Sequence, residues 1–263
     1  SEPIHFDLVV IGGGSGGLAA AKRAADYGAR VAVIESGRLG GTCVNVGCVP
    51  KKIMWNAAAA AHAIADAAGY GFDVTTNGHD WAQLKVRRDR YVARLNEFYV
   101  RSLAEKGVES IAGCGVLEDA RHVRVGERRL QADRILIAVG GEPVVPALPG
   151  AEAGITSDGF FELESLPRRV AIAGSGYIAV ELAGMLRALG ADVELFARYD
   201  SVLRSFDTLL QEAVVDALQA DGVTLHPYAV PAGLERTDDG LMMNTQAAGQ
   251  FGPRDHFRIA GKQ

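Results

Sequence analysis

Residues 6–17 read Phe-Asp-Leu-Val-Val-Ile-Gly-Gly-Gly-Ser-Gly-Gly, a short apolar run that leads directly into a cluster of glycines. A nearly continuous apolar run of this length is typical of a parallel strand that is buried on both faces. The glycines contain the spacing G-x-G-x-x-G, and an apolar-rich helix is expected over residues 18–27. A second strand, residues 31–34, is followed by Glu35. This order of strand, glycine turn, helix, strand and acid predicts an α/β unit that binds a dinucleotide.

The glycine turn and the acid have separate tasks in such a unit. The glycines allow the backbone to approach a pyrophosphate, which the N-terminus of the helix stabilises. The carboxylate is placed to accept hydrogen bonds from ribose hydroxyls. The contacts predicted from this pattern are Gly12, Gly14, Gly17 and Glu35.

The same pattern recurs in the second half of the chain. Residues 170–173 are expected to form a strand, and residues 174–179 (Gly-Ser-Gly-Tyr-Ile-Ala) have the spacing G-x-G-x-x-A. A helix to about residue 189 and a strand over residues 193–196 complete the unit. The sequence therefore predicts two Rossmann-like dinucleotide-binding units in one α/β chain.

The two units differ at the position of the acid. Glu35 lies 23 positions after Gly12, whereas the same offset from Gly174 reaches Ala197, which Arg198 follows. Arg198 alone also fits a solvated surface residue, but beside a missing acid it accommodates a ribose phosphate. With Arg204 as a second positive contact, this site is predicted to prefer NADPH over NADH.

A pair of cysteines lies between the two units, in residues 40–52 (Gly-Gly-Thr-Cys-Val-Asn-Val-Gly-Cys-Val-Pro-Lys-Lys). In a regular helix, residues five positions apart have Cα atoms roughly 8–9 Å apart, whereas a disulfide needs about 5.5–6 Å. The spacing of Cys43 and Cys48 therefore predicts a break that Gly47 allows. Pro50 suits the first turn of the next helix, whose free amides favour a thiolate at Cys48. We interpret the pair as redox-active, although two buried, unreactive cysteines would share this spacing.

The composition limits the possible functions. The chain has 263 residues, a hydrophobic share of 48%, 32 glycines and a formal charge of −5. The negative charge argues against nucleic acid as a partner, and no apolar run is long enough for a membrane span. With only three cysteines, a secreted disulfide scaffold is not expected, so the pair indicates catalytic redox in a reducing compartment, the cytoplasm. Two nucleotide units and a thiol pair together predict electron transfer from a nicotinamide through a flavin, FAD, to a disulfide.

The chain resembles the flavoprotein disulfide reductases of the pyridine-nucleotide type, from about Phe6 to about Gly222. Several branches of this family share residues 41–48 (Gly-Thr-Cys-Val-Asn-Val-Gly-Cys). Four further segments resemble the glutathione reductases more than other branches: residues 49–56, 91–99, 154–161 and 202–207. The resemblance implies NADPH-dependent reduction of glutathione disulfide, and a homodimer for full-length members.

The resemblance also implies roles for single residues. Cys43 corresponds to the interchange thiol that attacks glutathione disulfide, and Cys48 to the thiol that faces the flavin as a charge-transfer donor. Lys51 corresponds to a lysine that pairs with Glu181 beside the flavin ring, and Tyr177 to a gate that the nicotinamide displaces.

The predicted contact sets combine the glycine turns with the resemblance. For FAD they are Gly12, Gly14, Ser15, Gly16, Gly17, Glu35, Gly41, Thr42, Cys43, Lys51 and Gly115. For NADPH they are Gly174, Ser175, Gly176, Ile178, Glu181, Arg198 and Arg204. The implied glutathione site contains Ser15, Lys22 and Tyr99, although the position of Lys22 varies in the family. Tyr99 also fits core packing, because it belongs to a helical stripe with Val92, Leu95 and Leu103.

The expected domains are an FAD-binding part at residues 1–142, a connector at 143–166, an NADPH-binding part at 167–249 and an atypical tail at 250–263. Full-length family members continue to the rest of the FAD domain and to an interface domain with a His–Glu acid–base pair. None of the six histidines lies in such a context, so we expect a C-terminally truncated chain for which a homodimer is not assumed. A non-catalytic nucleotide-binding fragment and a reductase for another disulfide remain alternative interpretations.

Overall fold

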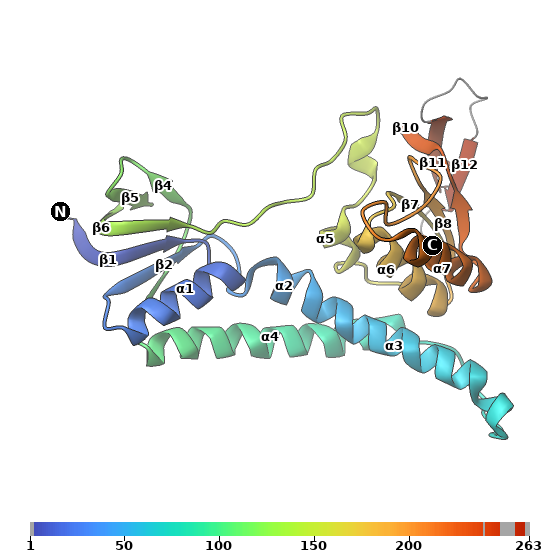
Figure 1. Ribbon diagram of the computed structural model, residues 1–263, viewed down its shortest axis with the longest axis horizontal. Coiled ribbons are helices and arrows are strands. Elements are labelled where there is room, and N and C mark those ends of the chain that lie inside the picture. Colours follow the sequence, from blue (N-terminus) through green and yellow to red (C-terminus); the bar gives the residue numbers. More distant parts are fainter. Residues whose placement is uncertain (1–2, 239, 248–255, 261–263) are drawn as a thin grey trace. The chain divides into compact units, whose positions relative to one another are not determined.

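The computed structural model describes residues 3–238, 240–247 and 256–260 (Figure 1). The chain divides into two compact units. The first consists of Ser1–Lys52 and Val86–Glu142, and the second of Ile53–Lys85 and Pro143–Gln263. Within the described part of the chain, no helix combines the length and the apolar character that a membrane span requires.

The first unit contains a six-stranded sheet with the order β3-β2-β1-β6-β5-β4. The four strands β1 (Ile4–Ile11), β2 (Val31–Glu35), β3 (Glu109–Ala112) and β6 (Arg128–Ile137) pair in parallel. The strands β4 (Gly115–Leu117) and β5 (His122–Val125) join β6 in antiparallel pairs. The alternation of polar and apolar residues around 113–136 predicts this antiparallel extension, and the structure confirms it.

The helices of this unit are α1 (Ser15–Asp26), α2 (Gly41–Asn45), the first turn of α3 (Cys48–Asp66) and most of α4 (Trp81–Glu105). One face of the sheet packs against α1 and α4 through a buried cluster that includes Val10, Leu18, Val33 and Leu103. Val9 and Ile11 point to the opposite face, because successive residues of a strand alternate in direction, and they pack with β5 and β6 side chains. Both faces of β1 are therefore buried, as its apolar sequence predicts.

The second unit holds the second nucleotide pattern. Its parallel sheet has the order β7-β8-β9, made of β7 (Arg169–Ala173), β8 (Asp192–Phe196) and β9 (Thr224–His226). The crossovers contain α6 (Tyr177–Ala188) and α7 (Thr208–Ala220). The unit also includes the rest of α3, the short helices η1 (Ala67–Tyr70), η2 (Ala151–Ala153) and α5 (Ser157–Phe160).

An antiparallel sheet follows the second nucleotide fold. It is formed by β10 (Ala229–Thr237), β11 (Gly240–Ala247) and β12 (His256–Ala260). Of the tail predicted at residues 250–263, only the residues of β12 lie among those that the structure describes. The predicted fold class, two Rossmann-like α/β units, is confirmed. The largest boundary difference is at α1, which begins at Ser15 rather than at Leu18, so the last glycines of the fingerprint already belong to its first turn.

Candidate functional site

The first glycine turn has a backbone that admits no side chain at two positions. Gly12 has φ +108°, and a Cβ on it would lie 2.2 Å from the Ala138 carbonyl oxygen. A Cβ on Gly17 would lie 1.9 Å from the Gly12 carbonyl oxygen. Glycine is therefore required both for the left-handed turn and for the close packing of α1 on β1. This turn leaves the N-terminal amides of α1 free to face an anionic group, so its residues fit the pyrophosphate of a dinucleotide.

Glu35 lies at the carboxyl end of β2, beside this turn. Its Oε2 accepts a 2.6 Å hydrogen bond from the Gly13 amide, and its Oε1 accepts a 2.7 Å hydrogen bond from the Gly37 amide. The half-buried carboxylate is thus held between two loops, at the position where a Rossmann unit binds ribose hydroxyls. A cavity of about 280 Å³ opens beside it, lined by Glu35, Gly37, Arg38, Leu39, Asn96, Val100, Ser110, Ile111 and Ala112.

The helix is broken between the two cysteines, as their spacing predicts. The short helix α2 ends at Asn45, Val46 has φ −142° and ψ 34°, and α3 begins at Cys48. A Cβ on Gly47 would lie 2.7 Å from the Thr42 carbonyl oxygen, so this break requires a glycine. Both cysteines are free thiols, with Cys43 half-buried and Cys48 exposed.

Backbone contacts attach the cysteine segment to the glycine turn. The Gly40 amide donates a 2.8 Å hydrogen bond to the Gly13 carbonyl, and a Cβ on Gly41 would lie 2.7 Å from the Gly14 Cα. The Ser15 hydroxyl, in the first turn of α1, faces the Cys43 thiol and lowers its pKa. The structure therefore places the thiol pair beside the dinucleotide turn, within one compact unit.

The environment of Cys43 disfavours its thiolate. Burial raises the pKa of the Cys43 thiol, and the Cys48 thiol raises it further through a hydrogen bond and Coulombic repulsion. The Cys48 amide and the Ser15 hydroxyl lower the same pKa, but by less. Since a thiolate is the reactive form, Cys43 is held largely protonated at neutral pH until a base or a change in its surroundings releases the proton.

We expect this raised pKa to appear in the pH dependence of alkylation. The rate at Cys43, measured by iodoacetamide labelling and peptide mass spectrometry, should keep rising past the pH at which an ordinary cysteine has ionised. Because the folded pKa lies above the unfolded value, the stabilising contribution of this thiol is complete below the unfolded pKa and is lost as pH rises through the folded pKa. A rate that levels off at or below the usual thiol pKa would contradict this environment.

The second glycine turn repeats the geometry of the first with a different residue at the acid position. The Gly174 amide donates to the Phe196 carbonyl at 2.9 Å, as the Gly12 amide donates to the Ile34 carbonyl at 2.8 Å. The residue after Phe196 therefore corresponds in space to Glu35. It is Ala197, which is fully buried. This position supplies no carboxylate, in agreement with the predicted offset.

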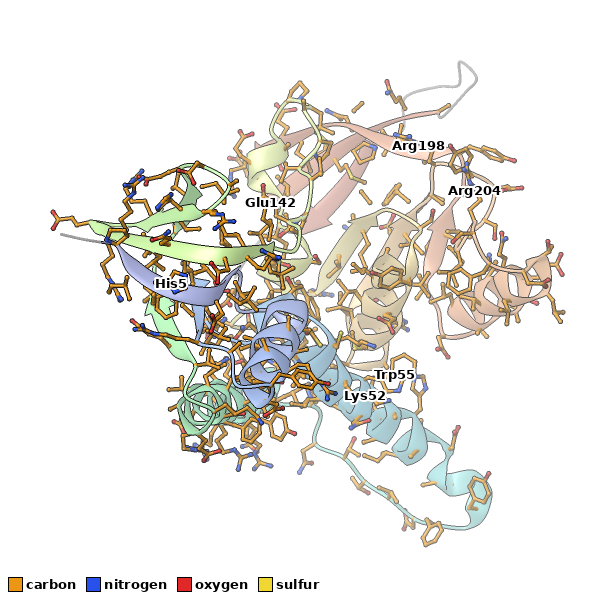
Figure 2. All side chains as sticks on the ribbon, turned by 60° about the vertical axis from the view of Figure 1, so that its left-hand side comes forward. His5, Lys52, Trp55, Glu142, Arg198 and Arg204 are labelled. Carbon is orange, nitrogen blue, oxygen red and sulfur yellow. The ribbon has the colours of Figure 1, made fainter. Side chains whose placement is uncertain are left out.

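Two exposed arginines lie in the segment between β8 and α7 (Figure 2). The Leu203 amide donates a 2.8 Å hydrogen bond to the Ser175 carbonyl, so this segment is joined to the glycine turn. The Arg204 guanidinium lies 4.2 Å from the centroid of the Tyr199 ring, a stacking that limits its motion. Sequence reasoning did not single out Tyr199, because no local spacing marks an aromatic residue as a partner of Arg204.

The comparisons with known proteins identify the family of this chain. Residues 6–251 match the pyridine nucleotide-disulphide oxidoreductase family. The chain belongs to this family. It is 46% identical over 255 residues to a glutathione reductase of Yarrowia lipolytica, covering 92% of the chain and 54% of that relative.

Two further relatives of the chain carry the same name. A glutathione reductase of Schizosaccharomyces pombe is 51% identical over 230 residues, which are 84% of the chain and 50% of the relative. One of Nostoc sp. is 44% identical over 245 residues, which are 93% of the chain and 53% of the relative. The chain spans about half the length of the curated relatives it matches.

The residues predicted for a glutathione site lie in the first unit. Lys22 Nζ lies 5.5 Å from the centroid of the Tyr99 ring, so the structure brings these two side chains together. Ser15 lies on the same helix as Lys22, in contact with Cys43. Tyr99 is half-buried and packs against the core cluster of α1 and α4, which agrees with the packing interpretation. Its substrate role stays a prediction.

The remaining predicted residues are distributed over both units. Lys51 lies in the first turn of α3, in the first unit, whereas Tyr177 and Glu181 lie on α6 in the second unit. The Tyr177 side chain is 62% exposed at the start of α6, a position open to a nucleotide. The pairing of Lys51 with Glu181 and the gate role of Tyr177 stay predictions. Thr42 lies on α2, Gly115 begins β4, and Ile178 lies in the first turn of α6.

The third cysteine has a different setting. Cys114 is an exposed free thiol in the turn between β3 and β4. Its side chain is therefore not part of the core.

Proposed function

We propose that this chain holds the FAD and NADPH sites of an enzyme that reduces glutathione disulfide, with Cys43 and Cys48 as the redox-active pair. One observation carries the proposal: the segment that carries Cys43 is joined to the glycine turn of a dinucleotide unit, since the Gly40 amide donates to the Gly13 carbonyl at 2.8 Å and a Cβ on Gly41 would lie 2.7 Å from the Gly14 Cα. A thiol pair at that turn can exchange electrons with a flavin bound there. The relatives named glutathione reductase support glutathione disulfide as the substrate.

We assign FAD to residues 1–142 and NADPH to residues 167–249. The glycines at 12 and 17 leave room for a pyrophosphate, and Glu35 is oriented for a ribose. In the second unit, the buried Ala197 and the exposed Arg198 and Arg204 suit a ribose that carries a phosphate. A reactive thiol pair is typical of proteins in reducing compartments, so we propose a cytoplasmic location.

The chemistry of the pair follows from its geometry. When bound, FAD supplies the route by which two electrons pass from NADPH to the disulfide. The disulfide takes up these two electrons and two protons to give two thiols. A thiolate at Cys43 then attacks one sulfur of glutathione disulfide, forms a mixed disulfide and releases one glutathione thiol. Attack by Cys48 on the Cys43 sulfur releases the second glutathione and restores the protein disulfide.

The Cys48 amide and the Ser15 hydroxyl assist this sequence at Cys43. Both groups lower the pKa of the Cys43 thiol and so favour its negative charge. They oppose the burial that keeps the thiol protonated. Because Cys48 is exposed at the start of α3, its thiol is accessible to a flavin bound at the glycine turn.

The proposal is tested by absorbance spectra of the FAD-reconstituted chain, recorded anaerobically before and after NADPH addition. We expect a flavin spectrum whose main band decreases on NADPH addition, with new absorbance at long wavelength, and a much weaker response to NADH. A Cys48→Ser variant is the control, because it should keep the flavin spectrum and lose the long-wavelength absorbance. A chain that takes up no FAD, or that responds equally to both nicotinamides, would contradict the assignment.

A further inference from the structure

Two asparagine side chains join the cysteine segment to a distant helix. Asn45 is the last residue of α2, and Asn96 lies on α4, 51 positions later. The Asn96 Nδ2 donates to the Leu39 carbonyl at 2.7 Å and to the Asn45 Oδ1 at 2.9 Å. The Asn45 Nδ2 in turn lies within hydrogen-bond distance of the carbonyls of Gly41 at 2.9 Å, Arg38 at 3.1 Å and Leu39 at 3.3 Å.

The chemistry of this network specifies an amide at both positions. The acceptors around the two Nδ2 groups are backbone carbonyls and one amide oxygen, so each side chain must donate, and Asn45 must also accept. An aspartate of the same shape would place carboxylate oxygens against carbonyl oxygens. Both asparagines are partly buried, and the loss of a partner for a buried polar group costs about 1–3 kcal/mol.

The network holds the loop that connects the nucleotide acid to the reactive thiol. This loop begins after Glu35, which is bound to the Gly13 and Gly37 amides, and it passes Gly40, whose amide is bound to the Gly13 carbonyl. It then enters α2, which carries Cys43. The N-terminal side of the loop is therefore fixed to the glycine turn, and the Asn45–Asn96 pair fixes its C-terminal side to α4.

We propose that Asn96, acting through Asn45, is a positioning residue that holds Cys43 within bonding reach of Cys48. This inference rests on the proposed redox role of the pair, and it adds a residue of α4 to the thiol site. Cys43 lies two positions before Asn45 in a helix of only five residues, which has little stability of its own. Release of the Asn45 anchor would therefore let α2 and its thiol move away from the start of α3.

The equilibrium between dithiol and disulfide measures this positioning directly. Oxidation of the pair forms the Cys43–Cys48 bond and transfers two electrons and two protons to one glutathione disulfide, whose S–S bond breaks to give two molecules of glutathione. Its equilibrium constant depends on how often the two sulfurs meet in a bonding geometry. A looser α2 lowers that constant, and a tenfold decrease corresponds to about 30 mV in the reduction potential of the pair.

Two variants distinguish a positioning role of Asn96 from an effect of charge at this position. Asn96→Leu removes both donated hydrogen bonds and keeps a similar volume, and Asn96→Asp keeps the shape but removes the donors. Because Asn96 borders the cavity of about 280 Å³, either side chain has room to adjust without a steric clash. Asn56→Asp is the matched control, since Asn56 is an exposed asparagine on the helix that begins with Cys48.

The experiment uses the full chain with Cys114→Ser, so that only two thiols react. The protein is equilibrated in buffers of reduced and oxidised glutathione, and the oxidised fraction of the pair is measured by alkylation and mass spectrometry. We expect a tenfold or greater decrease of the equilibrium constant in both Asn96 variants, and no change in Asn56→Asp. Thermal unfolding and circular dichroism show whether each variant is folded at the temperature of the measurement.

The outcomes distinguish this inference from the proposed function. If the chain with native asparagines forms no Cys43–Cys48 disulfide, the proposed redox role fails. If it forms the disulfide and a folded Asn96 variant keeps the same equilibrium constant, Asn96 is only structural and the positioning role is refuted. A change in Asn96→Asp that is absent in Asn96→Leu would assign the effect to charge, which also refutes it.

Discussion

Replacement of Gly17 by alanine should destabilise the first unit and abolish its ability to hold FAD. The new Cβ would lie 1.9 Å from the Gly12 carbonyl oxygen and 3.1 Å from a Val10 methyl group. Neither the turn nor the buried strand β1 can move without loss of the packing between β1 and α1. Overpacking of a core typically lowers the free energy of unfolding by about 1–3 kcal/mol. Because the new Cβ would meet the backbone rather than a flexible side chain, we expect a decrease of about 3 kcal/mol or more.

Denaturant unfolding and FAD content after reconstitution measure the effect. Gly16→Ala is the matched control for stability, because it lies in the same helical turn and has no atom within 4 Å of its built Cβ. Alanine should stabilise that position by up to about 1 kcal/mol, since glycine has a low helix propensity. Equal stability of Gly17→Ala and Gly16→Ala, with FAD retained in the former, would show that the close approach is not required.

Replacement of both Arg198 and Arg204 by leucine should remove the preference of the second unit for NADPH. A hydrogen bond to a charged group contributes about 1.5–3 kcal/mol, so loss of two contacts to a ribose phosphate should weaken NADPH binding by roughly 10²–10⁴-fold. NADH carries no such phosphate, and its affinity should change little. The stacking of Arg204 on Tyr199 at 4.2 Å further predicts that Tyr199→Leu weakens NADPH binding, by a smaller factor than the double variant does.

Titration calorimetry with NADP⁺ and NAD⁺ tests this without any need for flavin or turnover. Arg236→Leu is the control, since it removes an exposed arginine from β10 of the same unit. The difference in NADP⁺ affinity between the native and variant chains should decrease as the salt concentration increases, because exposed charges are screened. A double variant whose affinity falls equally for both nucleotides would indicate damage to the glycine turn. A double variant that keeps its affinity for both would show that the two arginines do not contact the nucleotide.

Several sequence patterns of this chain predict its local backbone structure, because they arise from steric rules that act within a few residues. A glycine at φ +108°, an apolar run before it and an acid after the next strand follow from the backbone of one βαβ unit, and the structure has them where the sequence predicts. The break between Cys43 and Cys48 follows from helix geometry together with the short distance that a disulfide between them needs. The absence of an acid after Phe196 could also be predicted, by counting the same offset from the second glycine turn as from the first.

Tertiary structure decided which of these segments meet. Sequence spacing does not indicate that Ser15 contacts Cys43, or that Asn96 binds the Leu39 carbonyl 57 positions away. These contacts exist because parallel sheet order brings the ends of β1 and β2 together, while α4 crosses the face of the same sheet. The sequence by itself determined the two nucleotide turns and the broken helix, since each depends on local backbone sterics. Only packing between distant segments decided how the thiol pair is held, because burial and hydrogen bonding there depend on partners that no local pattern specifies.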